Sequence, residues 1–175
     1  PDSLTHEFKT AHGRTVRDGG GITPDVTIEG HDYSRLTYSL VYSGIIQEYA
    51  LDYVREHADA DEDFHLADKD WDGFVAFAKT TEFDYRSSAK TYFDRMKKEL
   101  EKDGLSKNMS AELDALQKAL EMDKETFLKL KKDEIVPFIE EEIAVRYHFQ
   151  EAGIKIRLRY DDQLKKALAS PMIEI

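Results

Sequence analysis

The chain has 175 residues, of which 41% are hydrophobic and 35% are charged, fractions typical of a water-soluble globular protein. Its 9 Phe and 9 Tyr are more aromatic residues than a disordered chain carries, so we expect a folded core. A net charge of -11 argues against nucleic-acid binding, since phosphate contact needs clustered Lys and Arg. The lack of cysteine excludes disulfides, thiolate metal sites and a cysteine nucleophile in this segment.

The sequence also bears on membrane insertion and on completeness. No apolar run approaches the roughly 20 residues that a transmembrane helix needs. The chain begins at Pro1, without an initiator Met or a signal peptide. We therefore expect a segment cut from a longer protein, either one domain or one domain with a fragment of another.

Residues 3–17 have the pattern of a β-hairpin. Residues 5–10 alternate in polarity, His12-Gly13 supplies a tight turn in which glycine accepts a positive φ, and residues 14–17 resume an extended pattern. A lone hairpin is only marginally stable in water, because it buries too little area. The pattern thus predicts part of a sheet whose other strands lie outside this chain.

Three consecutive glycines, residues 19–21, follow the hairpin, and regular structure disfavours such a run because each glycine loses much backbone entropy on ordering. Residues 22–25 then lead into a predicted short strand over residues 26–29. A phosphate-binding loop is one functional alternative, but neither a Walker lysine with Ser or Thr nor a G-x-G-x-x-G motif opening a helix is present. We interpret the glycine run as a loop between strands.

Several residue types recur at fixed spacing in this region, namely Glu7-Phe8-Lys9-Thr10, Gly13-Arg14-Thr15-Val16 and Asp18-Gly19-Gly20-Gly21-Ile22-Thr23-Pro24-Asp25-Val26. The pattern resembles the segment that follows the catalytic core in bacterial C-terminal processing peptidases, which are tail-specific, tricorn-like serine proteases. The remainder, including residues 72–77 and 140–147, is similar to the C-terminal extension of one long bacterial branch of that family.

The resemblance implies a parent chain that is a serine-type peptidase, a hydrolase with a Ser nucleophile and a Lys general base, preceded by a PDZ-like substrate-binding domain. Both catalytic residues of that family lie upstream of the glycine-rich segment, so no Ser or Lys of this chain inherits a catalytic role. We therefore predict no catalytic, cofactor-binding or metal-binding residues here, and no proteolytic activity of the chain alone. The resemblance also implies a periplasmic or cell-envelope location.

After residue 33 the apolar spacing is that of helices. Residues 34–57 carry a wide apolar stripe at intervals of three and four, with Asp32 or Ser34 as N-cap and His57 as the end. We expect this helix to be the spine of the helical domain. Gly44 lies inside the stripe and predicts a close contact with another helix.

Residues 68–73 have the D-x-D-x-D-G opening of an EF-hand calcium loop. The twelfth position of such a loop carries a bidentate Glu, but here it is Lys79, which removes two oxygens and adds a positive charge. We therefore predict the first turn of a helix, with Asp68 as N-cap and with Asp70 and Asp72 facing the helix dipole. The buried stripe of this helix is expected to comprise Trp71, Phe74, Val75 and Ala78.

Further helices are predicted over residues 87–102, ending at Gly104, and from Ser110 towards residue 130, with a fresh start capped by Asp123. Another runs over residues 135–150, where Pro137 fits the first turn or a kink. Gly153 is expected to break it. Residues 154–159 alternate in polarity, but the resemblance favours a helix there, followed by a final short helix over residues 160–168.

A di-metal carboxylate site is the sharper alternative for Glu140, Glu141, Glu142 and His148. Such sites use Glu-x-x-His, and the residue three positions after Glu142 is Val145. The spacing fails, so we predict that His148 is a surface or boundary residue rather than a metal ligand.

The sequence thus predicts a mainly α protein with two parts: a β remnant of the peptidase core over residues 1–30, and a helical C-terminal domain over residues 31–175. The helical part would brace the core, gate substrate access or mediate self-association. Its expected partners are the upstream protease core and PDZ-like domain, the parent's protein or peptide substrates, and further copies in a homo-oligomer. The alternative is a free-standing helical domain that binds a partner helix or peptide through an aromatic groove.

Overall fold

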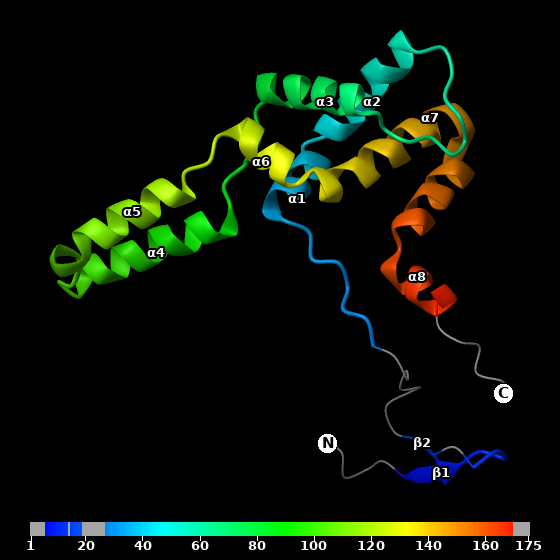
Figure 1. Ribbon diagram of the computed structural model, residues 1–175, viewed down its shortest axis with the longest axis horizontal. Coiled ribbons are helices and arrows are strands. Elements are labelled where there is room, and N and C mark those ends of the chain that lie inside the picture. Colours follow the sequence, from blue (N-terminus) through cyan, green and yellow to red (C-terminus); the bar gives the residue numbers. More distant parts are fainter. Residues whose placement is uncertain (1–5, 14, 19–26, 170–175) are drawn as a thin grey trace. The chain divides into compact units, whose positions relative to one another are not determined.

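A computed structural model of the chain describes residues 6–13, 15–18 and 27–169 (Figure 1). Contacts between Cα atoms divide the chain into two compact units, residues 1–31 and residues 32–175. The elements in chain order are β1 (Glu7–Lys9), β2 (Thr15–Arg17), α1 (Arg35–Tyr42), α2 (Ile45–Glu56), α3 (Asp68–Thr80), α4 (Ser88–Lys102), the 3₁₀ helix η2 (Ser106–Met109), α5 (Ser110–Leu120), α6 (Lys124–Leu130), α7 (Lys132–Tyr160) and α8 (Asp162–Ala169). The predicted mainly α fold with a short N-terminal hairpin is confirmed.

The first unit is built on the antiparallel pair of β1 and β2, in which Phe8 faces Val16. The turn contains Gly13, whose φ of 82° requires glycine, and the Gly13 amide donates to the Thr10 carbonyl at 2.9 Å. Residues 19–26, with the three glycines and the I-x-P-D string, lie outside the described residues. The strand predicted over residues 26–29 is wrong for residues 27–29, which belong to no strand; a strand needs a hydrogen-bonded neighbour.

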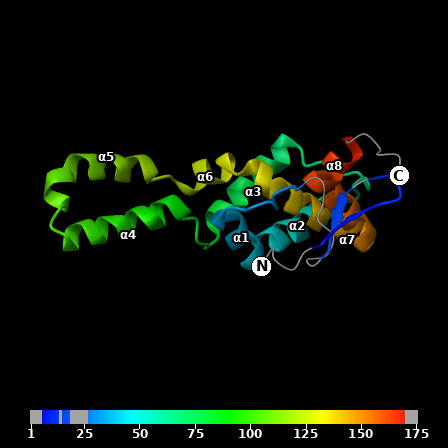
Figure 2. The same ribbon diagram turned by 90° about the horizontal axis from the view of Figure 1, so that it is seen from below.

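The second unit packs α1, α3 and α6 around the long contact between α2 and α7 (Figures 1 and 2). The predicted stripe of α3 is buried as expected, and α1, α2, α6 and α7 contribute further buried apolar residues. The main core therefore consists of Leu36, Leu40, Ile45, Ile46, Tyr49, Ala50, Tyr53, Trp71, Phe74, Val75, Ala78, Phe127, Leu128, Ile135, Ile139 and Ile143. Among the described residues no helix is both long enough and apolar enough to span a bilayer.

The predicted helix over residues 34–57 is two helices, because Gly44 has a φ of 79° and breaks it. A Cβ built on Gly44 would have no atom within 4 Å, so the expected close helix contact is wrong. The glycine is needed for its backbone conformation rather than for space. The ends were predicted correctly: Ser34 caps α1 and His57 closes α2.

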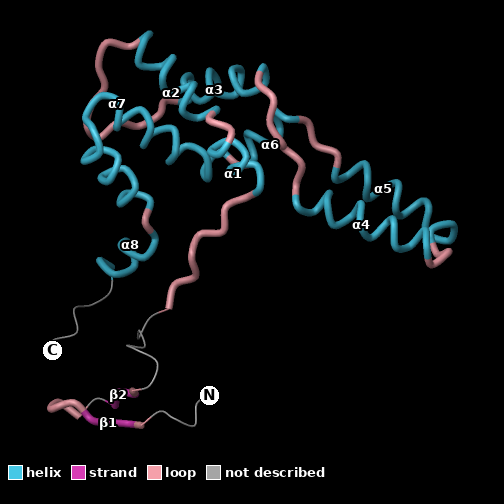
Figure 3. The backbone as a smooth tube through the Cα atoms, turned by 180° about the vertical axis from the view of Figure 1, so that it is seen from behind, coloured by secondary structure: helices cyan, strands magenta, loops and turns pink. Residues whose placement is uncertain are grey.

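Helices α4 and α5 run side by side as a hairpin that extends away from the other helices of the second unit (Figure 3). Ser87 caps α4, Gly104 ends it with a φ of 73°, and the Asp123 side chain caps α6 by accepting from the Thr126 amide. Only Phe93 and Leu113 are buried in this hairpin, whereas Tyr92, Met96 and Leu116 are exposed.

Helix α7 is bent sharply near its middle rather than at Gly153. His148 has φ -128° and ψ 17°, and Phe149 has φ 62° and ψ -169°, so two helical halves meet there (Figure 1). The second half continues through residues 154–159, which confirms the helix predicted for them. Gly153 lies buried inside it, so the predicted break at Gly153 is wrong.

The backbone of Phe149 occupies a region that is almost exclusive to glycine, and its side chain is 81% exposed. We expect Phe149→Gly to stabilise the folded chain by about 1 kcal/mol, because relief of strain worth about 1–3 kcal/mol exceeds the added glycine entropy of about 0.5–1 kcal/mol. Thermal unfolding of the two proteins measures this difference. Phe149→Ala keeps the Cβ and should show no such gain; an equal gain would assign the effect to the ring.

Gly153 lets the two halves of α7 approach closely. A Cβ built there would lie 2.5 Å from Val145 Cγ2. Alanine is the better helix former by about 1 kcal/mol, but overpacking a stiff β-branched neighbour costs about 1–3 kcal/mol. We expect Gly153→Ala to lower the free energy of unfolding by about 1 kcal/mol in urea titrations. In a Val145→Ala background the same change should become stabilising; a loss that persists there would rule out this contact.

Candidate functional site

Residues 68–73, which resemble the opening of a calcium loop, form the start of helix α3 rather than a loop. Its N-cap is Ala67 rather than the predicted Asp68, whose carboxylate instead accepts from Lys132 Nζ at 2.7 Å. The Asp70 carbonyl accepts from the Tyr49 hydroxyl at 2.6 Å. Burial, followed by the nearby Asp70 charge, raises the pKa of Tyr53 to about 12. This acidic turn therefore holds α2, α3 and α7 together.

The candidate di-metal residues do not converge. Glu141 pairs with Arg157 and Glu142 pairs with Arg146, while His148 Nε2 lies 2.6 Å from the Ala60 carbonyl. Within the described ranges, no three His, Cys, Asp or Glu side chains are grouped as a metal site requires.

Glu140 is the one of these acids that occupies a built site, since its side chain is only 2% exposed. Its carboxylate accepts from the Leu66 amide at 2.8 Å, from Arg159 Nη1 at 2.9 Å and from the Tyr160 hydroxyl at 2.8 Å. A buried carboxylate is stable only when charged and hydrogen-bonded partners replace water. Burial, and then the bond to Glu140, raises the pKa of Tyr160 to about 12. We call Glu140, Leu66, Arg159 and Tyr160 the Glu140 clasp.

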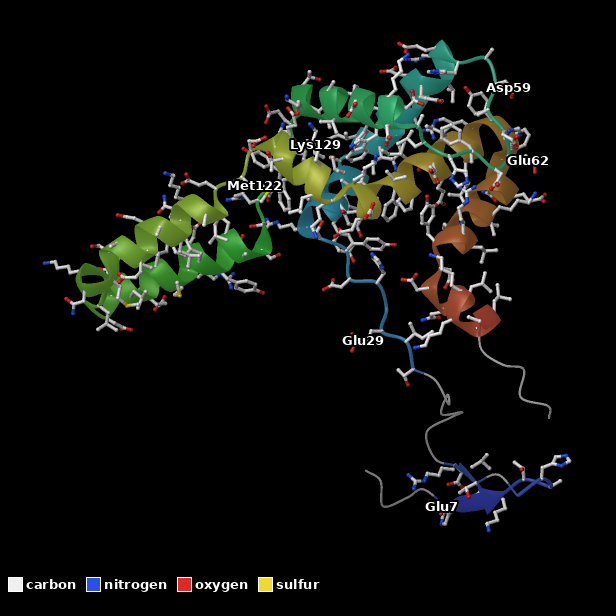
Figure 4. The ribbon with its side chains drawn as sticks, viewed as in Figure 1. Glu7, Glu29, Asp59, Glu62, Met122 and Lys129 are labelled. Atoms are coloured by element: carbon white, nitrogen blue, oxygen red, sulfur yellow. The ribbon has the colours of Figure 1, made fainter. Side chains whose placement is uncertain are left out.

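The Glu140 clasp also fixes the segment between α2 and α3. Arg159 Nη1 donates to the Phe64 carbonyl at 2.9 Å, and Arg159 pairs with Asp63. Lys155 Nζ lies 2.9 Å from Glu62, which lies with Asp59 beside the bend of α7 (Figure 4). The second half of α7 thus holds a connecting segment that has no regular structure of its own along most of its length.

A second carboxylate anchors the start of the helical unit. Glu134 accepts from the Ser34 amide at 2.8 Å and from the Thr37 hydroxyl at 2.9 Å, and pairs with Lys131 Nζ at 2.6 Å. Burial alone would raise its pKa, but hydrogen bonds from Lys131, Ser34 and Thr37 outweigh burial and lower the pKa of Glu134 to about 2. We call these contacts the Glu134 anchor.

The base of the α4–α5 hairpin forms a groove of about 560 Å³ near Met122 (Figure 4). Its lining is largely apolar, with Arg86 and Lys90 among its polar residues. Both are already engaged: Arg86 pairs with Asp84 at 3.2 Å, and Lys90 pairs with Asp94 at 2.5 Å. The groove offers apolar contact rather than a reactive group.

The carboxylates of the clasp and the anchor accept from several donors and hold chain segments together. The sequence interpretation missed both roles. The signal was present for Glu140, because it sits among the apolar positions Ile139, Ile143 and Ala144 of an inward helix face, where a lone acid indicates a buried pair. For Glu134 no such signal exists, since two of its three donors, Ser34 and Thr37, lie about a hundred positions earlier, and the third, Lys131, forms an ordinary i,i+3 pair.

A protein-family model matches most of the chain. A family described as "Probable PDZ-protease, C-terminal helical domain" matches residues 36–170, which begin in α1 and run through α8. No curated protein and no solved structure matches the chain significantly. Since the match covers well over half of the sequence, the chain belongs to the family of C-terminal helical domains of probable PDZ-proteases.

Proposed function

We propose that this chain is the C-terminal, non-catalytic part of a bacterial C-terminal processing serine endopeptidase, whose Ser and Lys lie upstream. The family match over residues 36–170 carries the proposal, together with the resemblance of residues 7–26 to the exit from such a protease core. The upstream lysine would need to be desolvated and neutral in order to deprotonate the serine. The parent would act in the periplasm or cell envelope on protein or peptide substrates.

Of the three roles considered, namely bracing the core, gating access and self-association, the geometry supports bracing best. Glu134 accepts a hydrogen bond from the amide of Ser34, which lies two residues after the start of the second unit at Asp32. The anchor and the clasp tie both ends of the helical unit to the long α2–α7 contact. These contacts hold the helical unit together internally, as a brace requires.

The parent chain tests this proposal. Full-length parent, parent truncated after residue 31 and the isolated 175-residue chain are compared for cleavage of an unstructured protein substrate and for thermal stability. We expect cleavage by the full-length parent, none by the isolated chain, and a core that unfolds at lower temperature after truncation. A truncated parent with unchanged stability and activity would contradict bracing. Cleavage by the isolated chain would contradict the non-catalytic assignment.

The second candidate is a free-standing helical domain that binds a peptide or helix. The exposed aromatic side chains of α1 favour it, because Tyr38 and Tyr42 stack with ring centroids 6.1 Å apart while Tyr42 remains 83% exposed. The sequence encoded upstream of Pro1 separates the two candidates. A PDZ-like domain and a Ser/Lys pair support the first, and their absence supports the second.

A further inference from the structure

The bend of α7 is a strained joint in a sequence that suits a straight helix. Residues 145–152 read Val-Arg-Tyr-His-Phe-Gln-Glu-Ala, with neither Gly nor Pro at the bend. Sharp helix bends ordinarily occur at such residues. Here Phe149 instead takes a φ of 62° and a ψ of -169°, and its ring is largely in solvent. The bend is therefore imposed by contacts made elsewhere in the chain.

Those contacts join residues at nearly equal distances on either side of Phe149. Glu140 meets Arg159 and Tyr160, Glu141 meets Arg157 at 3.0 Å, and Gly153 comes close to Val145. Glu140 lies nine residues before Phe149, and its partners lie ten and eleven residues after it. Glu141 and Arg157 each lie eight residues from Phe149, and Val145 and Gly153 each lie four. Two straight copies of α7, crossing about a two-fold axis at this position, can make the same pairs between chains.

We propose that the chain exchanges the second half of α7 with a second copy of itself. In the exchanged dimer, α7 is straight at Phe149, and Arg159 and Tyr160 of one copy complete the Glu140 clasp of the other. The contacts seen within one chain are kept between the two chains, and only the backbone at the joint changes. Exchange therefore relieves the backbone strain at Phe149 in both copies, and this gain opposes the entropy lost on association. The partner is a second copy, whatever the activity of the parent chain.

The length of the helix fits this arrangement. At 1.5 Å a residue, the 29 residues of a straight α7 would span about 43 Å. The half after Phe149 could then extend away from the helices of its own chain and pack against the second copy. The halves also share a buried cluster, Ala144 with Ala152 and Ile156, that is separate from the main core. Moving the second half therefore leaves the main core of α1, α2, α3 and the first half of α7 in place.

The first experiment measures mass by light scattering after size exclusion. The chain is incubated between about 1 μM and about 1 mM, the range over which weak complexes dissociate. We expect a species of twice the 20.2 kDa monomer mass whose fraction rises with concentration. A chain that remains monomeric over the whole range overturns the proposal.

Two variants of the joint separate exchange from ordinary surface association. Phe149→Gly relaxes the bend and should lower the association constant by about tenfold or more, whereas Phe149→Ala keeps the strain, favours the straight helix and should raise it. If the exposed ring itself were the contact, both variants would weaken the dimer alike. That result would overturn exchange.

A disulfide between the two halves of α7 shows whether both halves of a contact come from the same chain or from two chains. A Cβ built on Gly153 lies against the Val145 side chain, so cysteines at these two positions are close enough for a disulfide to be tested. The chain has no cysteine, so the double variant Val145→Cys with Gly153→Cys has no background. After oxidation, the dimer fraction should run as a covalent dimer in denaturing gels without reductant, and the monomer fraction as a single chain. A dimer fraction that runs as single chains would show that the halves are not exchanged. Each single-cysteine variant is the matched control.

Discussion

Replacing Glu140 by glutamine is expected to lower the free energy of unfolding by about 3 kcal/mol, the largest loss anticipated for any polar residue of the chain. The carboxylate is 2% exposed and binds three donors, so an amide in its place leaves Arg159 short of a partner and sets its own NH₂ against donors. Arg159 still pairs with Asp63 in the variant, so we expect the lost free energy to lie at the lower end of the range for a broken buried ion pair. Urea unfolding followed by helical circular dichroism measures the change.

A second measurement shows whether the loss arises at the clasp. The Leu66 amide donates to Glu140, so its hydrogen exchange should accelerate in Glu140→Gln more than that of amides in the main core. Glu151→Gln is the matched control, because its side chain is 81% exposed and forms a surface pair with Lys155. We expect this variant to lose about 0.5 kcal/mol or less. Equal losses in the two variants would show that the clasp contributes no more than a surface pair.

Acidification is expected to weaken the chain through the Glu134 anchor. The pKa of Glu134 falls from 4.5 to about 2 on folding, so the unfolded chain binds the proton more readily between these values. The contribution of Glu134 is therefore complete above pH 4.5 and is lost as the pH falls through about 2. With the carboxylate 16% exposed, we expect this contribution to be about 2 kcal/mol, somewhat below the full linkage value.

Glu134→Gln isolates this residue from the other carboxylates that titrate in the same range. Wild type and variant are unfolded in urea at a series of pH values, and the difference in unfolding free energy is followed. The difference should be largest near neutral pH and should shrink as acid protonates Glu134 in the wild type. A difference that stays constant down to pH 2 would mean that Glu134 does not titrate in this window. Glu48→Gln, on the exposed side of α2, supplies the control.

The helices of this protein were largely predictable because their apolar residues recur with helical spacing. Trp71, Phe74, Val75 and Ala78 form a buried stripe as expected. The caps Ser34 and Asp123 each accept from an amide three residues later. The prediction that residues 68–79 do not bind calcium also rests on local sequence, since Lys79 stands where such a loop needs a bidentate Glu. These features depend on neighbours along the chain.

The glycines were the least predictable residues, because one residue type serves two opposite purposes. Gly44 was expected to allow close packing and instead supplies a left-handed backbone in open space. Gly153 was expected to break a helix and instead lies within one, where it permits the approach to Val145. Sequence spacing does not distinguish a glycine needed for its backbone conformation from one needed for close packing. The difference depends on which atoms from elsewhere in the fold lie next to the glycine.

The sequence by itself determined the helical class, most helix ends, the absence of thiol chemistry and the resemblance to a protease tail, because each rests on composition or on contacts within a few residues. Only the tertiary structure decided where α7 bends and what Glu140 and Glu134 do. The bend falls in a helix-forming stretch, so its cause is the set of pairs from Glu140 to Tyr160 that outweighs local preference. Ser34 and Thr37, which donate to Glu134, lie about a hundred residues away from it in sequence, and only folding brings them together.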